Sequence, residues 1–271
     1  MSKQSSGAVV LLWGVVILAA VGAAWLIWQK EKAASPSSTA VTLPSSSSTA
    51  TAAQSPTGIQ HPINEAPAGA STVALPPLES SDSAVLASLL AMAGDDALKT
   101  LLVPEHIVPR IVATVDALPK QSVGLNLLPL RTPTGSFVAS HDDNGQAVLS
   151  EHNGERYATY LYVAKRMNPK AVVSWYKRYY PLFQQSYRDL GYADGYFNDR
   201  LVAVIDHLLA APEPHGPVAL VHPKAAYEFA DPSLQSLSAG QKFMIRLGPA
   251  GEAQMKSTLR AIREGVIAPG Q

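Results

Sequence analysis

The sequence contains no cysteine, which excludes disulfides, thiol nucleophiles and cysteine-based zinc or iron–sulfur sites. It also lacks a surplus of charge, because its 21 basic residues balance its 21 acidic residues. A nucleic-acid-binding domain normally carries a basic excess, so we expect no nucleic-acid partner. Two local absences divide the chain further: residues 33–98 hold no lysine or arginine, and residues 33–78 hold no aromatic side chain.

Residues 7–28 form an uncharged, apolar run that predicts a transmembrane helix. Such a helix would be about 33 Å long, which matches a bilayer hydrocarbon core about 30 Å thick. Trp25 and Trp28 lie close to Lys30 and Lys32, as expected where a span meets the lipid headgroups. The alternative is a cleaved secretory signal, but the apolar run continues to Trp28, past the position where a peptidase would normally cut.

The charges flanking this span do not fix its orientation, because lysines lie on both sides of it. The absence of basic residues from 33–98 is typical of a translocated segment. We therefore expect residues 1–6 in the cytoplasm and the bulk of the chain on the other side of the membrane. Gly22 and Ala23 belong to a face of small side chains that favours a weak homodimer through the transmembrane helix, although a plain tether explains the same pattern.

Residues 33–78 are expected to form a disordered linker. Of these 46 positions, 34 are Ala, Ser, Thr, Pro or Gly. A segment of this composition buries too little apolar surface to offset the entropy lost on ordering it. As a flexible coil, the linker would span roughly 35 to 40 Å.

Residues 79–271 are long enough for one globular domain, and their pattern predicts the α+β class, predominantly helical with a few short strands. Pro104 is expected to open a helix, and the Asn-Gly pair at 144–145 predicts a hairpin turn. The expected helices are 83–93, a short one ending at 102, 104–118, 169–190, 198–210 and 252–264. The expected strands are 136–140, 146–149, 218–221, 227–229 and 242–247.

The segment 157–197 is unusually aromatic, with 12 of the domain's 16 aromatic residues. The helix 169–190 carries several of them at the helical period, with Asn168 as its cap and Pro181 as an expected kink. Tyrosines suit a core when their hydroxyls find partners, and they suit a groove for a glycan or a peptide equally well. Core packing is the simpler interpretation, and a binding surface is the alternative.

The helix 198–210 carries the polar residues that could form a site. Asp199 and Asp206 lie about 10.5 Å apart along its axis, which is too far for a proton-sharing pair and slightly longer than the pair of an inverting glycosidase. His106 and His207 lack a third ligand at a suitable spacing, so we expect no metal and no cofactor. We assign no catalytic residue. The candidate binding residues are Tyr180, Tyr187, Tyr192, Tyr196, Asn198, Asp199, Arg200, Asp206 and His207, and we expect the polar ones to serve architecture or partner contact.

Several runs of the sequence are similar to a bacterial family known as domain of unknown function 3014. They are LLVPEHI (101–107), ATVDALP (113–119), YYPLFQQSYRDLGY (179–192), FNDRLVAVIDHLLAAPE (197–213) and LSAGQK (237–242). The resemblance covers nearly all of residues 85–264. It implies a single-span protein with an inner-membrane anchor and an uncharacterised soluble domain, and it implies no activity, cofactor or catalytic residue. Together with the orientation expected from residues 33–98, this places the C-terminal domain in the periplasm.

Three functions of different classes are compatible with the sequence. The first is a non-enzymatic binding or scaffolding module that contacts another envelope protein or the cell wall. The second is an envelope hydrolase or transferase acting on cell-wall material through Asp199, Asp206 and tyrosine-lined walls. The third is a sensor or regulatory subunit of a membrane complex. The lack of any catalytic signature favours the first.

Overall fold

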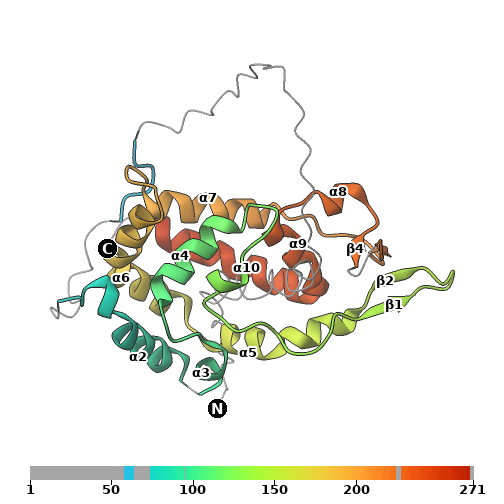
Figure 1. Cartoon of the computed structure of the whole chain (residues 1–271), viewed down its shortest axis with the longest axis horizontal. Coiled ribbons are helices and arrows are strands. Elements are labelled where there is room, and N and C mark those ends of the chain that lie inside the picture. Colours follow the sequence, from blue (N-terminus) through green and yellow to red (C-terminus); the bar gives the residue numbers. More distant parts are fainter. Residues whose placement is uncertain (1–57, 64–73, 95, 224–226, 269–271) are drawn as a thin grey trace, which may run out of the picture.

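The structure, a computed structural model, describes residues 58–63, 74–94, 96–223 and 227–268 (Figure 1). Within these ranges, no helix is both long enough and apolar enough to cross a membrane. The predicted transmembrane helix 7–28, with its small-residue face at Gly22 and Ala23, lies outside the described residues. The same holds for residues 33–57 and 64–73 of the predicted linker.

The described domain is predominantly helical with two small sheets, which confirms the predicted α+β class. Its α-helices are α2 Asp82–Ala93, α3 Ala97–Leu101, α4 Ile107–Ala117, α5 Ala158–Arg166, α6 Pro169–Asp189, α7 Phe197–Leu209, α8 Pro232–Gln235, α9 Ala239–Arg246 and α10 Gly248–Ile267. Its 3-10 helices are η2 Leu78–Ser80, η3 Leu125–Leu127 and η4 Glu151–Tyr157. Its strands are β1 Ala139–His141, β2 Ala147–Leu149, β3 Leu220–Val221 and β4 Glu228–Phe229.

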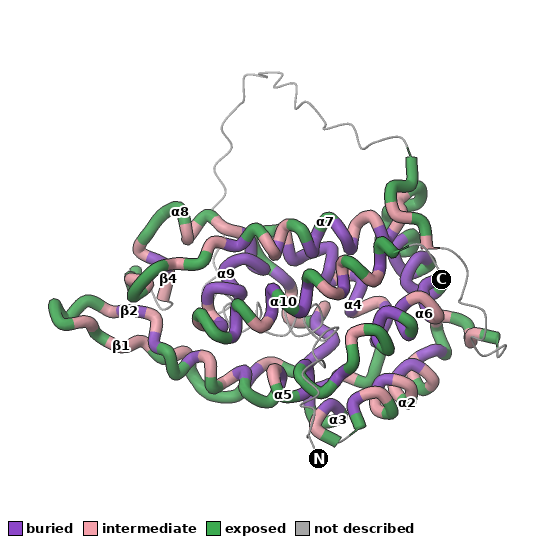
Figure 2. The backbone as a smooth tube through the Cα atoms, turned by 180° about the vertical axis from the view of Figure 1, so that it is seen from behind, coloured by how far each residue is buried: buried purple, intermediate pink, exposed green. Residues whose placement is uncertain are grey.

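The core lies among the long helices. α10 packs against α6, α7 and α9, and α4 packs against α2, α6 and α7. Figure 2 shows buried residues along these central helices, whereas the β1–β2 hairpin extends from one end of the bundle. An internal cavity of about 30 Å³ within this core is lined by aliphatic, methionine and aromatic side chains.

Both sheets are antiparallel pairs. The predicted hairpin is confirmed: Asp142 Oδ1 accepts the N–H groups of Asn144 and Gln146, and Gly145 takes the positive φ of 75° that the turn requires. A bridge between Val148 and Ala219 joins the two sheets side by side.

The aromatic segment is mainly core, as the simpler interpretation predicted. Trp175, Tyr176, Phe183 and Phe197 are buried and pack ring against ring, with Tyr176 and Phe183 centroids 5.2 Å apart. α6 runs as one helix through Pro181. Tyr162 and Tyr192 are the large aromatic side chains left exposed among the described residues.

The strand predicted at 242–247 is wrong, because residues 242–246 belong to α9 and Leu247 is its C-terminal cap. Ser238 begins this helix, since its Oγ accepts the N–H of Gln241, and a Ser-x-x-Gln spacing is a helix-start signature. Phe243, Met244 and Ile245 are all buried, which is why a run of consecutive apolar residues looked like a strand. The last helix is also longer than predicted, since α10 begins at Gly248.

α4 begins three residues later than predicted. The Asp82 carboxylate accepts the N–H groups of His106 and Ile107, at 2.6 and 2.8 Å. His106 takes a left-handed conformation with φ of 53°, so the chain turns into the helix only at Ile107. The carboxylate of Asp82, in α2, therefore caps the start of α4. No pattern within residues 104–118 indicates this cap.

Candidate functional site

The predicted site residues of α7 do not converge on one place. Tyr196, Asn198 and Asp199 lie at its first turn and contact the upstream segment 58–63. Arg200 faces α4, and Asp206 and His207 face α10 and α9. The helix therefore distributes its polar side chains to four different neighbours.

The first turn of α7 holds segment 58–63 through the backbone of that segment. The two Asp199 carboxylate oxygens accept the N–H groups of Gln60 and His61, at 3.0 and 2.7 Å. The Tyr196 hydroxyl accepts the N–H of Ile63 at 2.7 Å. This segment lies inside the range predicted as a disordered linker, so part of that range contacts the domain. Residues 74–78 are also described, and Leu75 and Leu78 pack on the core.

Asn198 is the buried centre of this contact. It is fully buried, and its Nδ2 donates to the carbonyls of His61 (2.9 Å) and Val266 (3.3 Å). Its Oδ1 accepts the hydroxyl of Tyr176 at 3.1 Å. Burial raises the pKa of Tyr176 well above its ordinary value, so this phenol stays a donor. One amide thus joins the upstream segment to α6 and α10.

The hydrogen bonds of this contact contribute about as much free energy as the ordering of the segment costs. Two hydrogen bonds to the charged Asp199 and two neutral ones contribute about 4 to 9 kcal/mol together. Ordering the backbone of residues 60–63 costs about 4 to 8 kcal/mol. The segment is therefore held weakly compared with the core.

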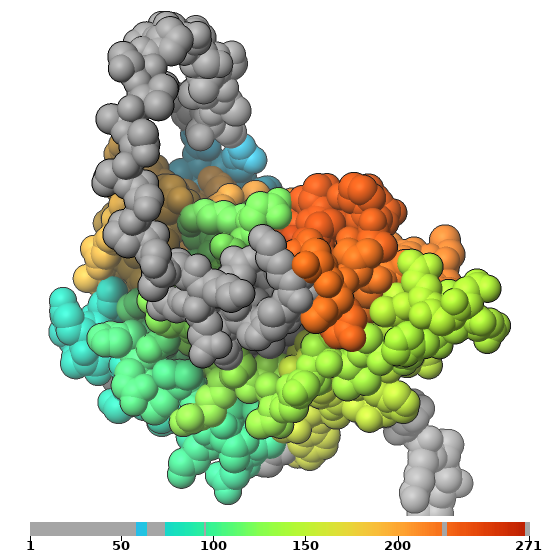
Figure 3. All heavy atoms as spheres, turned by 45° about the vertical axis from the view of Figure 1, so that its right-hand side comes forward, coloured from blue at the N-terminus to red at the C-terminus, as the bar shows by residue number. Residues whose placement is uncertain are grey.

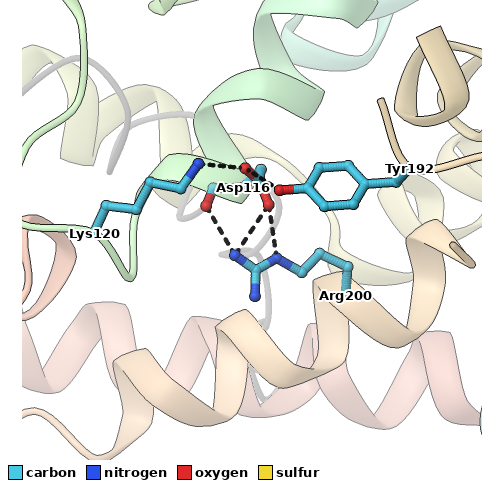
Figure 4. Close-up of polar contacts among 4 residues, drawn as sticks. All are labelled: Asp116, Lys120, Tyr192 and Arg200. Carbon is cyan, nitrogen blue, oxygen red and sulfur yellow. Dashed lines mark hydrogen bonds and ion pairs between the residues drawn. The ribbon is translucent and has the colours of Figure 1, made fainter. Parts of the chain in front are cut away.

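A second cluster surrounds the buried Asp116 of α4 (Figure 4). Arg200 donates from Nε to Asp116 Oδ1 at 3.0 Å and from Nη2 to the Asp116 carbonyl at 2.9 Å. Lys120 Nζ and the Tyr192 hydroxyl donate to Oδ2, at 2.7 and 3.1 Å. The cluster ties α4 to α7 and to the loop between α6 and α7.

Asp206 forms an ion pair with Arg263 of α10, whose Nη2 lies 3.0 Å from Asp206 Oδ2. The hydrogen bond and charge of Asp206 raise the pKa of the Arg263 guanidinium further. Asp199 and Asp206 thus serve separate partners and do not form a pair.

His207 packs against the start of α9, with its Nε2 2.8 Å from Ser238 Oγ. Burial, and after it the positive charge of Arg200, lower the pKa of His207 below 6.5. The side chain is therefore neutral in the folded protein near neutral pH.

This shifted pKa predicts a loss of stability in acid. The unfolded chain binds the proton of His207 more tightly than the folded chain, so stability should fall as the pH drops from 6.5 through the folded pKa. His207→Gln, which keeps a partner for Ser238, should narrow the difference in melting temperature between about pH 7.5 and about pH 5. His152→Gln is the control, because Glu155 raises the pKa of that exposed histidine and its removal should give no such gain. An unchanged pH profile in His207→Gln would contradict this prediction.

The predicted tyrosines divide between core and surface. Tyr180 is buried and donates to Gln184 Oε1 at 2.8 Å. Burial raises the pKa of Tyr187 to about 12, and its ring stacks on that of Tyr192 at 4.5 Å. Tyr192 and Tyr196 are thus the two whose rings reach the surface, and both hydroxyls already have protein partners.

A surface groove of about 310 Å³ lies between η2, the start of α4, η3 and the end of α6. Its lining includes His106, Ser186, Asp189 and the exposed Leu190. In the part of the chain that the structure describes, no hydrogen bond joins His106, Ser186 and Asp189 to one another, although a nucleophile and its base require one. Nor does any group of three or more potential metal ligands occur among the described residues.

The family model of the proteins of unknown function DUF3014 matches residues 107–263, which is more than half of the chain. The chain belongs to this family. The match begins at the first residue of α4 and ends at Arg263, so both partners of the Asp116–Arg200 and Asp206–Arg263 pairs lie inside the DUF3014 region. Segment 58–63 lies outside it. No curated protein and no solved structure matches the chain.

Proposed function

We propose that this DUF3014 protein is a non-enzymatic binding or scaffolding module, tethered to the bacterial inner membrane by the single span 7–28. Its C-terminal domain would face the periplasm and contact another envelope protein or the cell wall. The uncharged run at the N-terminus and the absence of lysine and arginine from 33–98 support the tether and its orientation.

The observation that supports a non-enzymatic function is that both candidate acids already have partners within the protein. Asp199 accepts two backbone N–H groups, and Asp206 pairs with Arg263. A general acid or base must have a carboxyl oxygen that can reach the substrate. These carboxylates instead hold the domain and its upstream segment together, which supports an architectural role.

The groove beside Leu190 is the surface on which binding can be tested. Because the chain has no cysteine, Leu190→Cys introduces a unique thiol there. Val221→Cys on β3 is a matched control, since both residues are 44% exposed. We expect a membrane-impermeant maleimide to label both variants of the full chain in cells with a permeabilised outer membrane. A photoactivatable maleimide should then give one reproducible crosslinked product at position 190 and none at position 221.

The two readouts test separate parts of the proposal. Labelling that requires rupture of the inner membrane would place the domain in the cytoplasm and overturn the orientation. Identical crosslinking patterns at positions 190 and 221 would remove the groove as a specific binding surface.

A further inference from the structure

We infer that the first turn of α7 is a reversible binding site for a bent peptide segment, and that segment 58–63 of the same chain is its ligand. The site consists of the side chains of Tyr196, Asn198 and Asp199. Figure 3 shows the segment on the surface of the molecule, and its residues are exposed or half-buried. The binding does not depend on the proposed membrane tether, whereas its consequence for orientation does.

The chemistry of the site recognises a backbone pattern. Asp199 and Tyr196 accept the N–H groups of residues 60, 61 and 63, and Asn198 donates to the carbonyl of residue 61. Residue 62 is proline, which has no N–H and needs no acceptor. The fitting ligand is therefore a segment that bends so that two successive free amides face one carboxylate, followed by a proline and then another amide.

Side chains of the segment add little to this recognition. Ile63 packs against the core, whereas Ile59 is exposed. One aliphatic contact next to the proline thus fixes the register, and the backbone hydrogen bonds supply the rest.

The domain side of the site keeps its structure when the segment leaves. Asn198 retains the Tyr176 hydroxyl and the Val266 carbonyl as partners. Asp199 and Tyr196 are both half-buried, so water replaces the lost amides. A site that is satisfied in both states opens and closes without unfolding the domain.

Release of the segment changes where the upstream chain leaves the domain. With the segment bound, residues 60–63 are attached to the start of α7. With the segment released, this attachment is lost, whereas Leu75, ahead of η2, still packs on the core. Segment 58–63 and the stretch that begins at residue 74 lie apart in Figure 1. If the upstream chain is anchored in the membrane as proposed, the bound segment determines which face of the domain is turned toward the membrane.

Hydrogen exchange of the full chain in detergent micelles tests the binding. We expect the amides of residues 60, 61 and 63 to exchange roughly tenfold or more slowly than unprotected amides. Asp199→Ala should remove the protection of residues 60 and 61, and Tyr196→Phe that of residue 63. Asp194→Ala, a change of an exposed acid in the preceding loop, is the matched control and should leave all three amides protected.

Gln60→Pro removes one donor from the ligand without altering the domain, and it should lower the protection of residues 61 and 63. The amides of α6 and α10 report in the same experiment whether each variant is folded. Unprotected amides at 60, 61 and 63 in the parent protein, or protection that survives Asp199→Ala and Gln60→Pro, would overturn the inference. Protection lost on dilution would show that the ligand comes from a second copy and would overturn binding within one chain. None of these outcomes depends on labelling at positions 190 and 221.

Discussion

Replacing Asp116 by alanine should lower the free energy of unfolding by about 3 to 5 kcal/mol, because it breaks a buried ion pair. The side chain of Asp116 is 4% exposed and accepts hydrogen bonds from Arg200, Lys120 and Tyr192. Its removal leaves the Arg200 guanidinium, only 29% exposed, without its counter-charge. Urea denaturation of the parent and the variant measures the difference.

Lys120→Ala is the matched control for this prediction. Lys120 binds the same carboxylate, but its side chain is 58% exposed. An ion pair formed by an exposed lysine contributes about 0 to 1 kcal/mol. Equal losses in Asp116→Ala and Lys120→Ala would show that burial of the cluster does not determine its strength.

Asn198→Ala should lower the free energy of unfolding by about 2 to 4 kcal/mol. The change removes the hydrogen bonds to His61, Val266 and Tyr176. The Tyr176 hydroxyl then lies in the core without a partner, and an unpaired buried polar group is costly. Thermal or urea denaturation of the full chain measures the loss.

A double-mutant cycle separates this buried contact from a general effect of losing an asparagine. Tyr176→Phe removes the unpaired hydroxyl, so Asn198→Ala should cost less in that background than in the parent. Asn168→Ala, which removes an exposed helix cap that binds the N–H of Lys170, should cost only about 1 kcal/mol. Strict additivity in the cycle would contradict the role of Asn198 as the partner of Tyr176.

The sequence predicted those helices and turns whose boundaries are set by neighbouring residues. Asn168 and Pro169 begin α6 as expected, and the Asn-Gly turn forms the β1–β2 hairpin. The start of α4 could not be found this way, because the carboxylate that caps it comes from Asp82, more than twenty residues earlier. The helix at 239–246 was missed because its apolar residues are consecutive, and helix and strand are then hard to distinguish by period.

In the candidate site, too, the sequence indicated the residues of one helix but not their distant partners. The polar residues of α7 were found from the sequence, but their partners Asp116 and Arg263 were not. Asp116 had one available signal, since it is a single acid in the otherwise apolar run ATVDALP. A buried acid in such a run requires a basic partner, yet nothing local identifies Arg200 as that partner.

The sequence by itself determined the α+β class, the family to which the chain belongs, and the absence of thiol chemistry. These three properties follow from the amino-acid composition and from patterns that repeat every few residues. Residues close together in the sequence are enough to specify them. Only the tertiary structure decided that the aromatic segment is core and that part of the predicted linker binds α7. Both depend on contacts between residues far apart in the chain: Asp199 meets His61 across 138 positions, and no local pattern specifies such a pair.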